Sequence, residues 1–166
     1  MTAPSRIIRE SICVDCSRSN AHRYLIEHFA RRTAEALPIL IRVPLADLAL
    51  DREIVVRLSD LPSNVIDHVM HVSWSAKGGG PYPTFFGSLT CLPVTATSSR
   101  IEVEGIYTIP GGIAGQAFDA VVGRRIALTA AHSLLERLQS VVEAARDFER
   151  SHMLLNAPKG YAPSCD

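Results

Sequence analysis

The longest patterned segment of the chain has helical periodicity and runs from about residue 113 past residue 142. Its apolar residues recur at three- and four-residue spacing and therefore share one face of a helix: Phe118, Val121, Leu128, Ala131, Leu135, Leu138 and Val142. Some 30 helical residues extend about 45 Å, whereas a domain of this size has a radius of gyration near ~15 Å. A helix this long must cross a whole domain, so the rest of the chain has to cover its apolar face.

The segments before this helix alternate apolar and polar residues, a pattern typical of strands with one buried face. Strands are expected at 6–14, 37–45, 54–58, 70–74, 85–94 and 101–109, with a helix after the first strand that ends near residue 33. Residues 46–51 are expected to form a short connector. Pro44 should end its strand or lie on a sheet edge, because proline has no N–H for the ladder. Gly87 and Gly105 interrupt neighbouring strands, which favours a strongly curved sheet.

The order of these elements is strand, helix, five antiparallel strands and one long helix. It predicts an α+β fold in which a curved antiparallel sheet of six to seven strands wraps around the carboxy-terminal helix. A sheet that bends around a straight helix cannot touch it along its whole length, so a space lined by inward side chains should remain between them. We expect residues 1–150 to form one domain and residues 151–166, which contain two prolines and a glycine, to form a flexible tail.

Two runs of sequence carry a family resemblance. The runs VSWSAKGGGPYPTFFGSLTCLP and IEVEGIYTIPGGIAGQAFDAVVGRRIALTAAHSLLERL resemble the second half of the START-like superfamily, which includes the Bet v 1-like, SRPBCC and polyketide-cyclase-like domains with the helix-grip fold. The similarity covers about residues 7–142. Its most specific stretch is Gly105-x-Tyr107-x-x-Pro110 followed by Gly111, Gly115 and Asp119, which resembles the start of the final helix in bacterial members.

The resemblance implies an internal cavity for a lipid, a sterol, a polyketide or another hydrophobic molecule. Members of the superfamily include carriers, hormone receptors, cyclases, hydroxylase components and hydrolase activators, so it implies a fold more than an activity. The leading hypothesis is binding or transport of a small hydrophobic ligand without catalysis. A polyketide cyclase/dehydratase-like lyase acting in the same cavity is one alternative. A protein-interaction module that uses the sheet edge or the long helix is another.

A set of apolar and aromatic residues is expected to line the space between sheet and helix and to contact the ligand: Met70, Val72, Trp74, Phe85, Phe86, Tyr107, Phe118 and Leu135. The alternative for each is an ordinary core residue. Trp74, the single tryptophan, and Tyr107 are favoured as ligand contacts. A buried indole N–H or phenol O–H needs a partner, which a polar group of a ligand can supply.

Catalytic and metal-binding patterns are weak. His71 and Tyr107 are the candidates for proton transfer, but no convergent set of titratable residues accompanies them. His68 and His71 would point to opposite faces of a strand and could not share a metal ion. The C-x-x-C pair of Cys13 and Cys16 lacks the two further ligands that a zinc site needs. We therefore expect no metal and no cofactor, and the role of the cysteine pair is left open.

Charge and targeting signals narrow the choice of partners. Seventeen basic residues balance seventeen acidic ones, so no net charge favours a nucleic acid. The first thirty residues lack a signal-peptide pattern, and no apolar run is long enough to span a bilayer. Four irregularly spaced cysteines do not suggest a disulfide-stapled secreted fold. We expect a cytoplasmic protein without stable membrane insertion, and a homodimer is left open.

Overall fold

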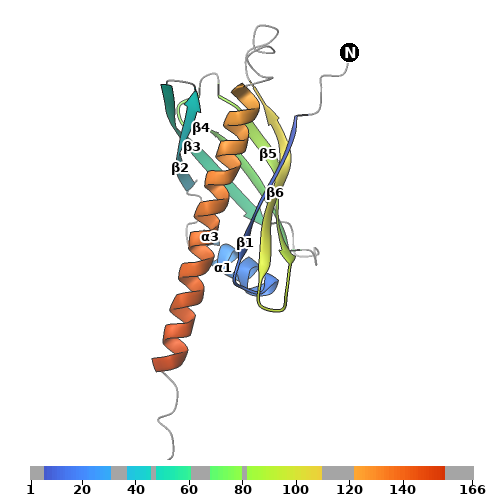
Figure 1. Cartoon of the computed structure of the whole chain (residues 1–166), viewed down its shortest axis with the longest axis vertical. Helices are drawn as coiled ribbons and strands as arrows, with labels where there is room; N and C mark the ends of the chain where they lie inside the picture. The colour runs from blue at the N-terminus through green and yellow to red at the C-terminus, as the bar shows by residue number, and fades with distance from the viewer. Residues whose placement is uncertain are drawn as a thin grey trace, which may run out of the picture.

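The computed structural model describes residues 6–30, 37–45, 48–60, 68–79, 82–109 and 122–155. Its elements in chain order are β1 (Ile7–Val14), α1 (Arg18–Ala30), β2 (Leu37–Leu45), β3 (Leu48–Asp60), β4 (Val69–Ala76), β5 (Thr84–Pro93), β6 (Ser99–Thr108) and α3 (Arg124–Leu155). The sheet curls into a half-barrel whose open side is crossed by α3 (Figure 1). This confirms the predicted α+β helix-grip architecture.

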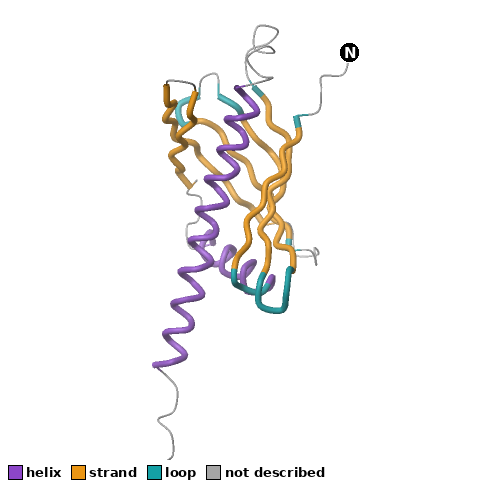
Figure 2. Tube along the Cα trace, in the orientation of Figure 1, coloured by secondary structure: helices purple, strands orange, loops and turns teal. Residues whose placement is uncertain are grey.

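The described strands form one antiparallel sheet in the order β1-β6-β5-β4-β3-β2. Each strand from β2 to β6 pairs with its neighbour in the chain, and β1 pairs with β6. The first two strands in the sequence therefore form the two edges of the sheet, with α1 between them in the chain (Figure 2).

The long helix α3 lies closest to the rims of the curled sheet. Its backbone approaches β1, β2 and β6, whereas the middle strands β3, β4 and β5 lie farther from it. Two side chains fasten it to the end of β1: Gln139 Nε2 donates to the Cys13 carbonyl at 3.1 Å and Arg146 Nη1 to the Asp15 carbonyl at 2.9 Å. The helix thus bridges the opening of the sheet and leaves the middle strands to be reached by side chains.

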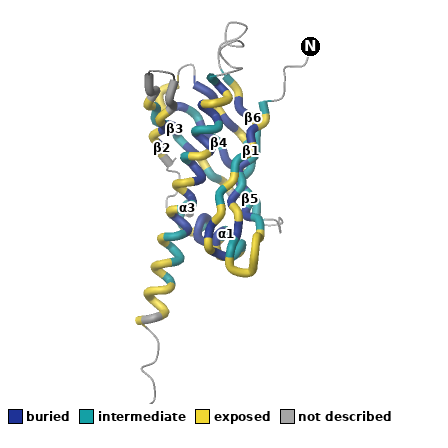
Figure 3. Tube along the Cα trace, in the orientation of Figure 1, coloured by how far each residue is buried: buried dark blue, intermediate teal, exposed yellow. Residues whose placement is uncertain are grey.

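The side chains on α3 change in size along this interface. Ile126 is the first buried residue of the helix, the small Ala127, Ala130 and Ala131 come next, and the larger Leu134, Leu135 and Leu138 follow. Buried and exposed residues alternate along the strands, and the last turns of α3 extend beyond the sheet with mostly exposed residues (Figure 3). Within the described part of the chain, no helix combines the length and the hydropathy needed to cross a membrane.

A pair of glycines marks the closest approach of two neighbouring strands. Gly87 and Gly105 lie opposite each other across β5 and β6. A Cβ on Gly105 would lie 2.5 Å from the Gly87 Cα, 2.5 Å from the Phe86 carbonyl oxygen and 2.6 Å from the Phe85 ring. No side chain fits at either position, because backbone atoms of the facing strand and the Phe85 ring occupy the space. The two glycines that the sequence singled out therefore form one site of close packing.

Some predicted boundaries differ from the structure. Residues 48–51, expected as a connector, belong to β3, because the β2–β3 hairpin is long and Arg42 Nε bonds Asp51 Oδ1 at 2.8 Å across it. Pro44 lies in β2, an edge strand, as the missing N–H required. The helix α3 continues to Leu155, past the predicted start of the tail at residue 151. The predicted first turns of the last helix, residues 113–121, fall outside the described residues.

Candidate functional site

The concave face of the sheet is lined by alternate residues of each strand. In β4 the inward residues are Met70, Val72 and Trp74, each at most 3% exposed, and in β5 they include Phe85 and Leu89. Because antiparallel partners share a face, the cross-strand pairing of Trp74 with Phe85 and of Phe85 with Tyr107 extends this lining over three strands. The result is a continuous apolar and aromatic surface that faces α3.

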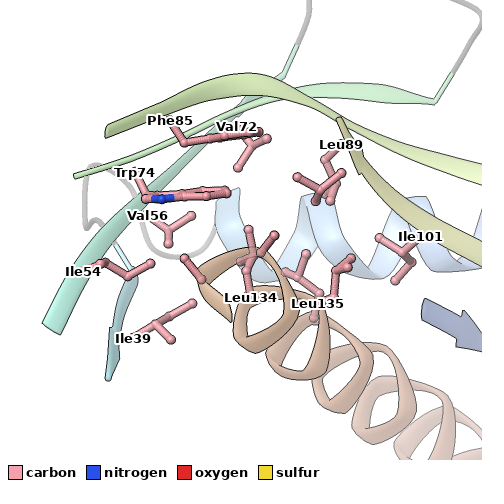
Figure 4. Close-up of a cluster of buried hydrophobic side chains, with 14 of the residues drawn as sticks. Ile39, Ile54, Val56, Val72, Trp74, Phe85, Leu89, Ile101, Leu134 and Leu135 are labelled. Carbon is pink, nitrogen blue, oxygen red and sulfur yellow. The ribbon is translucent and has the colours of Figure 1, made fainter. Parts of the chain in front are cut away.

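Two aromatic rings stack at the centre of this surface. Trp74 and Phe85 have ring centroids 3.8 Å apart and an interplanar angle of 9°. Phe85 lies over the glycine pair on one side and is covered by the Trp74 indole on the other. Figure 4 shows the indole between Phe85 and Val56, with Leu134 and Leu135 reaching toward the same interior from α3. The absence of side chains at Gly87 and Gly105 is thus what allows this stack to form.

Two hydrogen-bond donors buried in this region have no acceptor among the residues that the structure describes. Trp74 is 2% exposed and Tyr82, just before β5, is 5% exposed. Neither Trp74 Nε1 nor Tyr82 Oη has a hydrogen-bond partner among the described residues. Burial raises the pKa of Tyr82 to about 12, although the charge of nearby Arg52 offsets part of that rise. The phenol therefore stays protonated and remains a donor.

A cation lies on the same concave face. Arg52 pairs with Ile41 across the β2–β3 hairpin and precedes Ile54 by two residues, so it shares the inward face with these two fully buried isoleucines. Its Nη2 donates to the Gly79 carbonyl at 2.7 Å. Over the described ranges, no carboxylate forms an ion pair with Arg52. Arg52, Tyr82 and Trp74 lie toward the end of the sheet where β3 begins, β4 ends and β5 begins.

The predicted ligand contacts fall into three groups. Those buried in the interior are Met70, Val72, Trp74, Phe85, Tyr107 and Leu135. The expectation for Phe86 is wrong, because consecutive strand residues point to opposite faces. Its side chain is 65% exposed on the outer face, in a cross-strand row with Ile106 and Ile7. Phe118 lies outside the described residues.

The structure separates the two candidates for proton transfer. His71 is exposed on the outer face of β4, where its ring stacks on Phe86 with centroids 5.8 Å apart. It therefore points away from the interior and cannot act there, which corrects its assignment as a candidate base. Tyr107 is 5% exposed on the concave face.

Sequence reasoning missed Arg52 and Tyr82. Arg52 is an even-numbered residue of β3, like the inward-facing Ile54 and Val56, so strand alternation would place it on the inner face. The sequence did not predict this because the strand was expected to begin at residue 54. Tyr82 lies in a Gly- and Pro-rich segment that has no strand periodicity. As for metals, the described residues contain no group of three or more His, Cys, Asp or Glu side chains that could hold an ion.

A second hollow lies outside the half-barrel, between α1 and the distal part of α3. It has a volume of about 670 Å³ and is lined by Tyr24, Glu27, His28, Arg137, Ser140, Val141, Ala144, Ala145, Phe148 and Glu149. On its wall, Glu149 accepts from Arg23 at 2.7 Å and from the Tyr24 hydroxyl at 2.6 Å. These bonds hold the pKa of Glu149 below its usual value, with Arg23 the larger cause. We call this hollow the α1/α3 groove.

Comparison with solved structures identifies the fold. A norcoclaurine synthase point mutant from Thalictrum flavum, solved with a transition-state analogue, superposes with a TM-score of 0.54 at 12% identity, over 88% of this chain and 99% of the other. A Thermus thermophilus protein superposes with a TM-score of 0.50 at 13% identity, and a START superfamily protein from Mycobacterium smegmatis with 0.50 at 11%; each match covers 84% of this chain and 98% of the other.

No family model and no curated protein matches the sequence. The structural likeness nevertheless confirms the resemblance found in the sequence: the chain has the START-like, Bet v 1-like helix-grip fold. At these identities the comparison shows the fold alone.

Proposed function

We propose that this protein binds a small hydrophobic ligand between the concave face of the sheet and α3. The observation that carries the proposal is the pair of buried donors, Trp74 Nε1–H and Tyr82 Oη–H, which find no acceptor among the described residues. A buried donor without a partner costs about 1–3 kcal/mol. An acceptor on a bound molecule would recover that free energy for each donor.

The arrangement of α3 supports the same proposal. Because α3 approaches the rims of the sheet and α1 packs against β5 and β6, the inner face of β3 and β4 is covered by side chains and not by close backbone packing. Such an interior can admit an apolar molecule by rearranging side chains without unfolding an element. The edges of the stacked Trp74 and Phe85 rings would border such a molecule. Norcoclaurine synthase, which shares the fold, was solved with a transition-state analogue, and this precedent agrees with a small-molecule role.

We propose binding without catalysis. A cyclase or dehydratase mechanism needs polar groups that converge on a substrate. Of the two candidates for proton transfer, His71 points to the outer face, which leaves Tyr107 as the candidate on the concave face. Arg52, Trp74 and the protonated Tyr82 can donate hydrogen bonds to a ligand, but none of the three is a base that could take a proton from a substrate.

The test uses Trp74 as the reporter, since it is the single tryptophan in the chain. Delipidated protein is titrated with a saturated fatty acid, a sterol and a planar polyketide-like aromatic, while indole fluorescence, melting temperature and native mass are recorded. We expect at least one class to bind one molecule per chain and to change the indole emission. The proposal is wrong if no ligand class changes the indole emission, the melting temperature or the native mass, and if the protein before delipidation carries no small molecule.

A matched variant separates the interior from the α1/α3 groove. Ala144 is exposed in that groove, so Ala144→Phe fills the groove without disturbing the core. Binding in the interior predicts the same affinity for Ala144→Phe and the unmodified protein. Loss of binding in this variant would move the ligand to the groove and contradict the proposal.

A further inference from the structure

The three polar groups at the end of the concave face are all hydrogen-bond donors. An indole N–H only donates, a guanidinium has five N–H groups and no acceptor, and the Tyr82 phenol is held protonated by its burial. Trp74 and Tyr82 have no acceptor among the described residues, and Arg52 reaches only the Gly79 carbonyl there. All three can be satisfied together only by a ligand group that accepts hydrogen bonds.

The charges around Arg52 show why an anion is favoured over a neutral acceptor. The residues on either side of Arg52 in β3 are acidic but point to the outer face, where each pairs with another cation. Asp51 Oδ1 bonds Arg42 Nε at 2.8 Å, and Glu53 Oε1 bonds Lys77 Nζ at 3.0 Å. Strand alternation thus leaves Arg52 on the inner face without the carboxylates that flank it in sequence.

The helix adds positive charge at the same end of the fold. The amino-terminal end of α3 lies at the end of the half-barrel where β3 begins (Figure 1). Its first turn contains the exposed residues Arg124 and Arg125 and no acidic residue. Exposed positive charges at this end of the fold raise the local concentration of an oppositely charged ligand there.

We infer that the ligand is an amphipathic carboxylic acid whose carboxylate lies against Arg52, Tyr82 and Trp74 and whose apolar body extends along the Trp74–Phe85 stack toward Leu135. The inference rests on the proposed function and names the chemical class of its ligand. A carboxylate offers two acceptor oxygens to three donors, and its single charge matches Arg52, the one arginine that the described strands direct inward. A phosphate monoester would bring about −1.5 to −2 charges and leave part of that charge uncompensated.

The experiment compares ligands that differ only in the head group. Decanoate, 1-decanol, methyl decanoate and decyl phosphate are titrated at pH 7.5, below their aggregation limits, by calorimetry. The indole N–H resonance of the single tryptophan is followed by ¹H–¹⁵N NMR in parallel. We expect decanoate to bind tenfold or more tightly than the alcohol and the ester, and to shift the indole resonance on binding.

Variants test the three donors. Arg52→Gln should weaken decanoate binding tenfold or more and leave 1-decanol binding within twofold. Tyr82→Phe should lower the affinity for decanoate several-fold, since it removes one neutral hydrogen-bond donor and keeps the ring. Arg42→Gln is the matched control, because Arg42 is an outward-facing arginine paired with Asp51, and it should change neither affinity. If Arg52→Gln does not fold, Arg52→Lys replaces it. Lysine keeps the positive charge but lacks the paired N–H donors of the guanidinium, so its decanoate affinity should lie between those of the wild type and Tyr82→Phe.

Each outcome bears on one of the two proposals. Equal binding of acid and alcohol, or acid binding unaffected by both Arg52→Gln and Tyr82→Phe, overturns the carboxylate inference and leaves ligand binding intact. Tighter binding of decyl phosphate than of decanoate overturns the inference in favour of a phosphate head group. An unmoved indole resonance with bound decanoate also overturns it. If none of the four probes binds and the sterol and aromatic probes fail as well, the proposed function itself is wrong.

Discussion

A methyl group at Gly105 provides the sharpest test of the packing that positions the site. In the Gly105→Ala variant the new carbon would lie 2.5 Å from the Gly87 Cα and 2.5 Å from the Phe86 carbonyl oxygen. Ordinary contacts between such atoms are about 3.5–4.0 Å, so the overlap is roughly 1 Å on each. Both atoms belong to the backbone of β5 and cannot rotate away. Either β5 and β6 separate or their pairing shifts, and both changes disturb the Trp74–Phe85 stack.

The magnitude follows from these contacts. Overpacking of a closed core costs typically about 1–3 kcal/mol, and loss of an aromatic pair adds about 0.5–1.5 kcal/mol. We therefore expect Gly105→Ala to lower the free energy of unfolding by about 2–4 kcal/mol. For a domain of this length each kcal/mol corresponds to about 2–4 °C, so the melting temperature should fall by roughly 5–15 °C.

Urea unfolding followed by Trp74 fluorescence measures this effect, since the reporter lies in the stack itself. Gly78→Ala is the matched control: it makes the same chemical change where a Cβ would meet nothing within 4 Å, although φ is 77°. That backbone conformation costs an alanine about 1–2 kcal/mol. If Gly105→Ala is no more destabilising than Gly78→Ala, the result contradicts the close approach of β5 and β6 at the glycine pair.

Three further predictions concern the two faces of the sheet, the α1/α3 groove and the cysteines. Phe85→Ala should cost about 3–5 kcal/mol in urea unfolding, and Phe86→Ala at most about 0.5 kcal/mol, because only Phe85 is buried. The ionised Glu149 carboxylate is stabilised in the folded state, so its contribution is present above its unfolded pKa near 4.5 and is lost as the pH falls through the lower folded value. The difference in melting temperature between the wild type and Glu149→Gln should therefore shrink from pH 7 to pH 4. Cys91, buried and with a pKa raised to about 12, should react with a thiol reagent at pH 8 only after unfolding, whereas the exposed Cys13 should react at once.

For each of these three predictions, one result would contradict the structure. Similar losses for the two phenylalanine variants would contradict the assignment of the inner and outer faces. A melting-temperature difference for Glu149→Gln that grows toward pH 4 would contradict the sign of its pKa shift. Peptide mapping that finds Cys91 modified as fast as Cys13 in folded protein would contradict the burial of Cys91.

Much of the candidate site follows from local rules applied to the sequence. Strand alternation alone places Met70, Val72 and Trp74 on one face, and the structure buries all three. The same rule places Phe85 and Phe86 on opposite faces, so the sequence already excludes an inward Phe86 beside an inward Phe85. The position of Arg52 was also within reach, had its strand been extended back to residue 48.

Other features depended on contacts between distant segments. Tyr82 lies in a segment without strand periodicity, and its burial and its proximity to Arg52 follow from the β2–β3 and β4–β5 hairpins lying side by side in the sheet. The α1/α3 groove forms because Glu149, near the end of α3, bonds two residues of α1 about 125 positions earlier in the chain. No short stretch of sequence contains either relationship.

The sequence by itself therefore determined the order of the elements, the inward face of most strands and the glycine pair that marks their closest approach. These are properties of a few neighbouring residues, because side-chain alternation and helical periodicity are local geometry. Only the tertiary structure decided that β1 closes against β6, that α3 bridges the rims of the sheet, and that Arg52, Tyr82 and Trp74 lie at one end of its interior. Register and closure depend on the burial achieved by the whole sheet at once, and so they cannot be read from any one strand.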